Sequence, residues 1–424
     1  MKVKKTTFKV PTKEKKILAR FGLGVHSFSK YETIKDLNKC SPSMVTTSVC
    51  RPGTAIIDGK HEVNMRLGDI YVMNYGLFKR INNNNTYLEP YKKKFSQFFK
   101  RYYNNDLSGK KILFTRMGGL GDILFSQTCI KYLKNRYPDC QIDYATSPNN
   151  IEFFQSWESG LVENVLPIPY LLSDLKRYDY HATFEGSIER CHEAERLNCY
   201  DIFRKVLGLD FNVYNYLPNL VPLTNLVDEL KDLVPDNMIV IHMKSTSPLR
   251  NMEVPKWGRI VNSLIDLGYN VGIVDSPGSY MMYEDFITRF NFPRTKIFNF
   301  SNVSKSINHA IAIASLSKGL IGIDSSMTHI FGALDKPLVG LYGPFLSELR
   351  LKYYKYAIGI NADEFDNCCE KYPCFFHTPE IFECPTIKKN NIPACLSSLN
   401  ETKIIESLEK VIRMKNESES VHEN

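Results

Sequence analysis

Hydrophobic and polar residues along positions 110–343 follow two alternating patterns. Short apolar runs, such as Ile112–Phe114, give way to segments whose apolar residues recur at helical spacing, as Ile123 and Ile130 do. Buried parallel strands appear in a sequence as continuous apolar runs, whereas helices repeat about every 3.6 residues. The pattern therefore predicts a series of strand–helix units.

The series falls into two blocks, separated by a linker at residues 218–224. The predicted strands cover 112–114, 141–147, 162–170, 178–186, 238–244, 271–276, 296–300, 319–324 and 337–343. The predicted helices cover 123–133, 151–157, 189–207, 257–268, 280–290, 306–316, 325–334 and 401–413. Repeated βα units form parallel sheets that bind ligands beyond the carboxyl ends of their strands. We expect an α/β protein with two doubly wound, facing parallel sheets, a binding site in the cleft, and a last helix that crosses back to the first block.

The first hundred residues have a different pattern. Between Val45 and Ile81, short β-rich runs are separated by turn residues such as Pro52–Gly53, which is typical of a small β-rich module. Tyr91–Tyr103 mixes five cations with six aromatics and predicts a helix. Its aromatic face would either pack on the next domain or stack on a nucleic-acid strand.

The composition is that of a globular protein of two or three domains, with 424 residues of which 43% are hydrophobic. No long uninterrupted apolar run predicts a transmembrane helix, and the basic start lacks the apolar segment of a signal peptide. The eleven cysteines are odd in number and unevenly spread, which favours reduced thiols over a disulfide framework. We expect a cytoplasmic protein.

The positive charge is concentrated at one end. Residues 1–110 hold 22 Lys+Arg and 8 Asp+Glu, whereas the rest of the chain holds 32 and 38. Such an excess either solubilises the surface or docks on a polyanion such as nucleic acid, anionic lipid or lipopolysaccharide. Docking on lipid would make the protein peripheral to a membrane.

A Gly-rich turn follows the first strand of the first block, with glycines at Gly118, Gly119 and Gly121. Glycines let a backbone approach a ligand closely, but this turn does not match the dinucleotide pattern GxGxxG and has no Walker lysine. Asp122 follows the glycines at the start of the predicted helix. It is either a helix cap or a general base.

The second block has a further polar motif, Asp324–His329, between a strand and a helix. Ser325 and Ser326 can cap that helix, and the free N–H groups at its start would hold a diphosphate. His329 lies one turn further on and could add a hydrogen-bond donor.

These segments together resemble glycosyltransferase family 9, the heptosyltransferases. Arg116–Asp122 resembles that family's R-x-G-x-x-G-D opening, and Asp324–His329 resembles its D-T/S-G-x-x-H motif. Lys336–Pro344 and His242–Trp257 resemble two further family segments, G-K-P-V-x-x-L-F-G-P and the stretch H-x-x-(S/T)-(S/T) that ends in Trp. The resemblance covers roughly residues 109–412.

The resemblance implies a GT-B fold, a nucleotide-diphospho-sugar donor and an inverting mechanism that requires no metal cofactor. It also implies that Asp122 is the base and that Asp275 binds the ribose or base of the donor. The other residues that it assigns to the donor are Ser245, Ser247, Arg250, Asp324, Ser325, Ser326 and His329. On this basis we expect a basic N-terminal extension with the β-rich module at 1–108, an acceptor domain at 109–225, a nucleotide-sugar domain at 226–416 and a tail at 417–424.

The sequence departs from the family pattern at three places. Ser326 replaces the glycine of the second motif, and the spacing from Arg250 to Trp257 is longer than usual. The segment around Glu185 is unlike a lipopolysaccharide-core acceptor region. Glu185 is a second candidate for the base, or else a carboxylate at a helix start.

Four cysteines near the end of the chain, Cys369, Cys374, Cys384 and Cys395, could bind a structural zinc. They lack a C-x₂-C knuckle, so packed free thiols are the alternative.

Three functions follow from these patterns. The first is sugar transfer to a bacterial glycan or lipopolysaccharide. The second is glycosylation of a modified base in DNA, as phage enzymes perform it, with the basic N-terminus on the polyanion. The third is non-catalytic binding of a nucleotide sugar.

Overall fold

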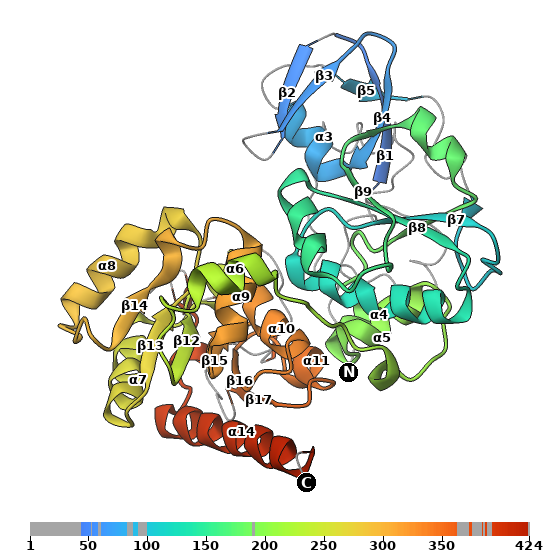
Figure 1. Cartoon of the computed structure of the whole chain (residues 1–424). Helices are drawn as coiled ribbons and strands as arrows, with labels where there is room; N and C mark the ends of the chain where they lie inside the picture. The colour runs from blue at the N-terminus through green and yellow to red at the C-terminus, as the bar shows by residue number, and fades with distance from the viewer. Residues whose placement is uncertain are drawn as a thin grey trace, which may run out of the picture. The chain divides into compact units, whose positions relative to one another are not determined.

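The structure is a computed structural model that describes residues 44–51, 53–57, 61–82, 88–91, 100–188, 191–362, 373–374, 384, 386–387 and 392–422. They form two compact units (Figure 1). Unit 1 holds the described residues up to Phe154 together with Ser159–Tyr216, and unit 2 holds Gln155–Glu158 and the described residues from Leu217 onward. The four segments predicted from the sequence, and the three boundaries between them, stay predictions.

Unit 1 is built on a parallel sheet with the strand order β6-β11-β7-β8-β9. These strands are β6 (Lys100–Arg101), β11 (Tyr180–Thr183), β7 (Lys111–Thr115), β8 (Gln141–Thr146) and β9 (Asn164–Pro167). The chain leaves β7 toward β8 on one side and later returns to β11 on the other side. The carboxyl ends of β7 and β11 therefore form the switch point at which α/β sheets bind ligands.

The helices that accompany the parallel sheet of unit 1 follow its strands in sequence. They are α4 (Leu120–Arg136) and α5 (Cys199–Val206), with 3₁₀ helices η3 (Pro148–Ser156), η4 (Leu172–Arg177), η5 (His192–Glu195) and η6 (Val213–Tyr216). Phe125 of α4 packs edge-on against Tyr200 of α5, with ring centroids 4.8 Å apart. The apolar faces of both helices are thus buried in one core.

A second, antiparallel sheet belongs to unit 1, with the order β10-β4-β1-β5. We call it the N-terminal sheet, and it consists of β10 (Tyr170–Leu171), β4 (Ile70–Asn74), β1 (Met44–Val49) and β5 (Leu88–Pro90). A hairpin of β2 (Gly53–Ile57) and β3 (His61–Met65) and the helix α3 (Tyr75–Ile81) accompany it (blue in Figure 1). The β-rich module predicted from the sequence is therefore confirmed, with one strand, β10, taken from the parallel-sheet region.

Unit 2 has a six-stranded parallel sheet with the order β14-β13-β12-β15-β16-β17. Its strands are β12 (Met238–His242), β13 (Asn270–Ile273), β14 (Ile297–Asn299), β15 (Gly319–Ile323), β16 (Leu338–Tyr342) and β17 (Ala357–Asn361). The chain passes from β12 to β13 on one side and returns to β15 on the other. The switch point of this sheet thus lies between β12 and β15.

Helices surround the sheet of unit 2 (Figure 1). They are α6 (Thr224–Leu230), α7 (Val254–Asp266), α8 (Tyr280–Arg289), α9 (Ile307–Leu316), α10 (Ser326–Ala333), α11 (Glu348–Leu351), α13 (Ala394–Ser397) and α14 (Glu401–His422), with 3₁₀ helices η7 (Pro248–Arg250), η8 (Pro277–Ser279) and η9 (Phe300–Asn302). The last helix packs on α7, β15, β16 and β17 of its own unit. Whether it crosses back to the first block stays a prediction.

Two predicted helices are wrong in part. The segment 189–207 contains η5 and α5 rather than one helix. Asn198 is the N-cap residue of α5, and its side chain accepts the Tyr200 N–H at 3.1 Å. The helix predicted over 91–103 fails at Lys100–Arg101, which form β6, and residues 92–99 lie outside the described part. Lys100 and Arg101 pair with β11 at the edge of the parallel sheet instead of forming a helix.

Candidate active site

The Gly-rich turn, Arg116–Asp122, lies at the switch point of unit 1, between β7 and α4. Its N-cap residue, Gly119, has a φ of 75°, which favours glycine, and an added Cβ would collide with the Asp122 carboxylate. Asp122 is in the first turn of α4, where the helix dipole favours negative charge. The cap position itself is thus taken by Gly119, and Asp122 depends on that glycine for its place.

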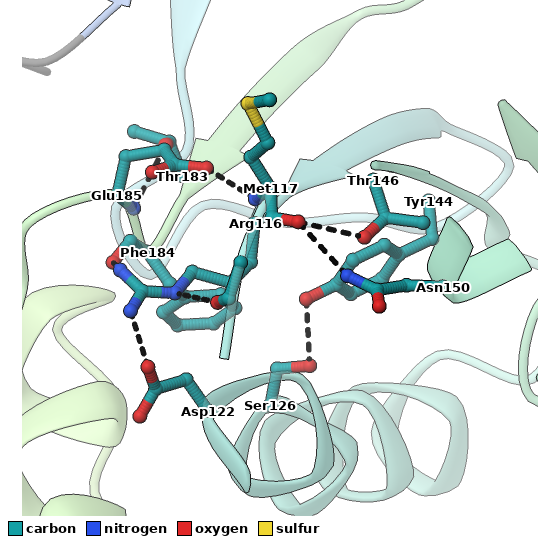
Figure 2. A network of polar contacts seen from close by, with 11 residues as sticks. Arg116, Met117, Asp122, Ser126, Tyr144, Thr146, Asn150, Thr183, Phe184 and Glu185 are labelled. Atoms are coloured by element: carbon teal, nitrogen blue, oxygen red, sulfur yellow. Dashed lines mark hydrogen bonds and ion pairs between the residues drawn. The ribbon is translucent and has the colours of Figure 1, made fainter. Parts of the chain in front are cut away.

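Arg116 fixes the turn from inside. Its Nε donates to the Gly118 carbonyl oxygen at 2.9 Å, Nη1 donates to the Phe184 carbonyl oxygen at 3.1 Å, and Nη2 pairs with the Asp122 carboxylate (Figure 2). The Arg116 side chain is 4% exposed and that of Asp122 is 22% exposed. The planar guanidinium therefore orients a carboxylate that solvent, and hence a substrate, can still reach.

Glu185 comes to the same turn from the end of β11. Its carboxylate, in a residue 7% exposed, accepts the backbone N–H of Met117, and its own N–H donates to Thr183 Oγ1 at 3.2 Å (Figure 2). The segment 185–188 is a turn, so the alternative of a carboxylate at a helix start is wrong. Glu185 instead holds the backbone of the Gly-rich turn.

A buried polar pair lies on the two central strands behind the turn. Thr115 Oγ1 is 2.8 Å from His181 Nε2. Burial, reinforced by the charge of Arg101, lowers the pKa of His181 from 6.5 to about 3. The imidazole is therefore neutral at neutral pH and pairs with the Thr115 hydroxyl as an uncharged partner.

In unit 2, the loops after β12 and β15 meet at the switch point. The first carries Ser245, Ser247 and Arg250, and the second carries Asp324 and Ser325. Arg250 Nη1 donates to the Asp324 carbonyl oxygen at 3.0 Å and lies 3.6 Å from Asp324 Oδ2. The structure thus brings the predicted residues of these two motifs together.

The first of these loops is held by short-range hydrogen bonds. The N–H of Ser245 donates to Asn251 Oδ1 at 2.8 Å, and Ser245 Oγ accepts the N–H of Ser247 at 3.2 Å. Ser245 therefore shapes the loop that presents Ser247 and Arg250.

Three polar atoms at this switch point are buried without a hydrogen-bond partner among the described residues. They are Ser247 Oγ, Arg250 Nε and Ser325 Oγ. Leaving such an atom unpaired costs about 1–3 kcal/mol, and native structures contain few of them. A cluster of three is typical of a site whose ligand completes the hydrogen bonds.

Arg350 of α11 was not found from the sequence. It is 5% exposed, its guanidinium lies 4.6 Å from the centre of the Phe345 ring, and its Nε is 4.0 Å from Asp324 Oδ1. Asp324 is thus flanked by two arginines, a pair suited to phosphate oxygens. Only its position shortly after the Lys336–Pro344 motif could have drawn attention to Arg350.

The helix α10 begins at this site. Ser325 is its N-cap residue, but the Ser325 hydroxyl makes no capping bond, so that part of the prediction is wrong. His329 Nδ1 lies 3.1 Å from the Tyr354 hydroxyl, and burial lowers its pKa from 6.5 to about 4, with the Arg350 and Arg250 charges acting in the same direction against Asp324. His329 is therefore neutral, and Ser326 opens the helix beside it.

Asp275 lies one strand further along, after β13. Its carboxylate accepts the Tyr283 hydroxyl at 2.7 Å and the Ser276 N–H at 2.6 Å. Its predicted contact with the ribose or base stays a prediction.

The cysteine cluster is described only in part, because Cys369 lies outside the described residues. Cys374 is partly buried, Cys384 and Cys395 are buried, and Cys384 Sγ is 3.4 Å from Thr386 Oγ1. Within the described part of the chain, no three His, Cys, Asp or Glu side chains are arranged to hold a metal ion. Zinc at this cluster stays a prediction.

Two doubly wound parallel-sheet domains with polar loops at their switch points are the architecture of GT-B glycosyltransferases, and the predicted fold class is confirmed. Residues 202–378 of the chain match the model of glycosyltransferase family 9 (heptosyltransferase). This match confirms the resemblance found from the motifs and identifies the chain as a glycosyltransferase.

Three solved structures share the fold. Heptosyltransferase II of E. coli is 16% identical with a TM-score of 0.52, over 72% of this chain and 99% of that chain. A family 9 protein from Veillonella parvula DSM 2008 is 15% identical with a TM-score of 0.55, over 73% and 98%. The iron-containing dodecameric glycosyltransferase TibC from enterotoxigenic E. coli H10407 is 13% identical with a TM-score of 0.51, over 87% and 91%.

No curated protein sequence matches the chain. None of the helices in the described ranges has the length and apolar character that would let it cross a membrane.

Proposed function

We propose that this enzyme moves a heptose-type sugar from an ADP-linked donor to a hydroxyl of a bacterial glycan or lipopolysaccharide, with inversion at the anomeric carbon. The observation that supports the proposal most is the cluster of Arg250, Arg350 and the unpartnered Ser247 and Ser325 hydroxyls, inside the matched family segment. The choice of nucleotide rests on the relatives, since a TibC structure holds ADP-D-β-D-heptose.

In the proposed donor site, the diphosphate lies at the N-terminus of α10. Arg250 and Arg350 offset its charge, and the hydroxyls of Ser247 and Ser325 donate to its oxygens. Asp324 lies between the two guanidinium groups and offsets part of their mutual repulsion. Asp275 binds the ribose, and His329 acts as a neutral hydrogen-bonding group.

In the proposed transfer step, Asp122 accepts the proton of the acceptor hydroxyl while the hydroxyl oxygen attacks the anomeric carbon of the donor. The bond from that carbon to the diphosphate oxygen breaks, and ADP leaves with the electron pair. Arg116 keeps the Asp122 carboxylate oriented during the attack.

The test is release of ADP from ADP-D-β-D-heptose, with heptose-free lipopolysaccharide core as the acceptor and mass spectrometry of the product. We expect Asp122→Asn to lower turnover by about 10²–10⁴-fold. The thermal stabilisation that the donor produces should remain, because donor contacts are unchanged. Asp174→Asn, at an exposed carboxylate of the same unit, is the matched control.

Three outcomes would contradict the proposal. Turnover of Asp122→Asn within a few-fold of the wild type would exclude Asp122 as the base. Donor binding without ADP release for any acceptor would favour a non-catalytic binding protein. Transfer to duplex DNA alone would favour the DNA glycosyltransferase.

A further inference from the structure

Met117 connects the Gly-rich turn to the N-terminal sheet. Its side chain is 5% exposed and belongs to one hydrophobic cluster with Val49 of β1, Val72 of β4 and Leu77 of α3. Figure 2 shows this side chain directed away from Asp122. The Met117 side chain is therefore part of a hydrophobic core that continues into the N-terminal sheet.

The backbone of Met117 is also fixed on both sides. Its N–H donates to Glu185, and its carbonyl oxygen accepts from Asn150 Nδ2 at 3.0 Å and from the Ser147 N–H at 3.2 Å (Figure 2). These bonds fix the backbone of Met117 directly before the glycines and Asp122, so Met117 joins the turn to the core that holds its side chain.

The N-terminal sheet is joined to the parallel-sheet region by hydrogen bonds as well. Strand β10, which follows β9 in the chain, pairs antiparallel with β4 so that Tyr170 lies opposite Val72. Leu113 of β7 and Ala145 of β8 belong to the same hydrophobic cluster. The sheet is thus built into unit 1 at the back of the turn.

We propose that the N-terminal sheet is part of the catalytic machinery and that Met117 is the positioning residue through which it holds Asp122 in place. This inference rests on the proposed function, because it concerns the base of that reaction. A displacement of about 1 Å at a reacting group can lower a rate by about 10²-fold. A loosened Met117 anchor should therefore lower turnover without touching the donor.

The first readout is hydrogen exchange, which does not depend on activity. Val72→Ala removes two methyl groups from the shared cluster at a distance from the turn in sequence. We expect faster exchange in peptides covering 113–121 and unchanged exchange in peptides of unit 2. Ile56→Ala, at a β2 side chain that is 64% exposed, is the control within the same module. Unchanged exchange at 113–121 in folded Val72→Ala would overturn the inference.

The second readout is turnover in the ADP-release assay. Met117→Ala should lower kcat by about 10–10²-fold while the KM for ADP-D-β-D-heptose changes by less than about threefold. Met117→Leu, which conserves volume, should restore most of kcat, and a melting curve for each variant checks that it is folded.

A double-mutant cycle separates positioning from a general loss of structure. If Met117 acts through Asp122, then Met117→Ala should cause no further loss in an Asp122→Asn background. The same fold-loss in both backgrounds would overturn the inference. If Asp122→Asn alone retains turnover, the base assignment fails instead, and hydrogen exchange still decides whether the N-terminal sheet holds the turn.

Discussion

Asp122 and Glu185 are two carboxylates at one switch point, and their partners give them different tasks. Asp122 pairs with a guanidinium and stays partly exposed, so it can meet an acceptor hydroxyl. Glu185 is buried and holds the N–H of Met117. We therefore propose Asp122 as the base, while Glu185 holds the backbone of the Gly-rich turn.

Substitutions at Glu185 test this division. Glu185→Gln keeps an oxygen that can accept the Met117 N–H, so turnover should fall by less than about tenfold, whereas loss of a general base costs about 10²–10⁴-fold. Glu185→Ala leaves the buried N–H unpaired and should lower the free energy of unfolding by about 1–3 kcal/mol. The measurements are ADP release and urea unfolding. Loss of turnover in a fully stable Glu185→Gln variant, as large as in Asp122→Asn, would make Glu185 the base.

The two neutral histidines predict how stability depends on pH. The folded-state pKa values of His329 and His181 lie at about 4 and about 3, below the ordinary 6.5. The unfolded chain therefore binds more protons than the folded one below pH 6.5. The stabilisation is complete above that pH and is lost as the pH falls toward these folded-state values.

As the pH falls from 6.5 to 5, protonation of each of these histidines in the unfolded chain should lower the free energy of unfolding by about 2 kcal/mol. Urea unfolding at a series of pH values measures the slope. His329→Gln should remove the contribution of one histidine from the slope of unfolding free energy against pH, whatever its effect on stability at neutral pH. A free energy of unfolding that stays constant over this range in the wild type would contradict charge-free burial of both rings.

At the scale of elements, the sequence was most informative where burial is complete. The strands β7, β12, β15 and β16 are apolar runs buried on both faces and were predicted, and α4 was predicted from Ile123, Ile130 and Leu133 at helical spacing. The helix α3 was missed inside a β-rich pattern, although Asn74 caps it by accepting the Leu77 N–H at 2.7 Å. Strand β6 owes its form to pairing with β11, which no local pattern reveals.

The candidate site was predictable to the same degree. Asp122, Arg250 and Ser325 stand in motifs and were found from them. Arg350 and the Met117 anchor depend on tertiary contacts between segments far apart in the chain, so spacing alone could not give them.

The Gly-rich turn allows a matched pair of substitutions. Gly119→Ala places a Cβ against the Asp122 carboxylate at a positive φ and should lower turnover by about 10²-fold. Gly118→Ala meets no atom within 4 Å and needs no left-handed backbone, so its effect on turnover should be much smaller. ADP release and melting temperature report the two effects. Equal losses in both variants would mean that the turn tolerates no side chain at all, and that the Gly119–Asp122 contact is not decisive.

At the scale of the whole molecule, the residues before the N-terminal sheet carry a different net charge from the rest of the chain. Residues 1–43 hold 11 Lys+Arg and 3 Asp+Glu, and the remaining residues hold 43 of each, so the whole net charge of +8 lies in residues 1–43. The strands from Met44 onward share a core with the parallel-sheet region. Any polyanion grip should therefore be sought in residues 1–43, since removing 1–108 would cut into the core of unit 1.

A chain that begins at Met44 tests this division. It should keep the donor-induced thermal shift of the full chain, because the proposed donor residues lie between Ser245 and Arg350. It should also lose salt-dependent retention on vesicles with anionic lipid, since a basic residue near such a surface contributes about 1 kcal/mol. Replacing Lys2, Lys4, Lys5 and Lys9 by glutamine keeps the length and should weaken retention in part. Equal retention of full and shortened chains would place the docking surface elsewhere, and retention on duplex DNA but not on vesicles would favour a nucleic-acid acceptor.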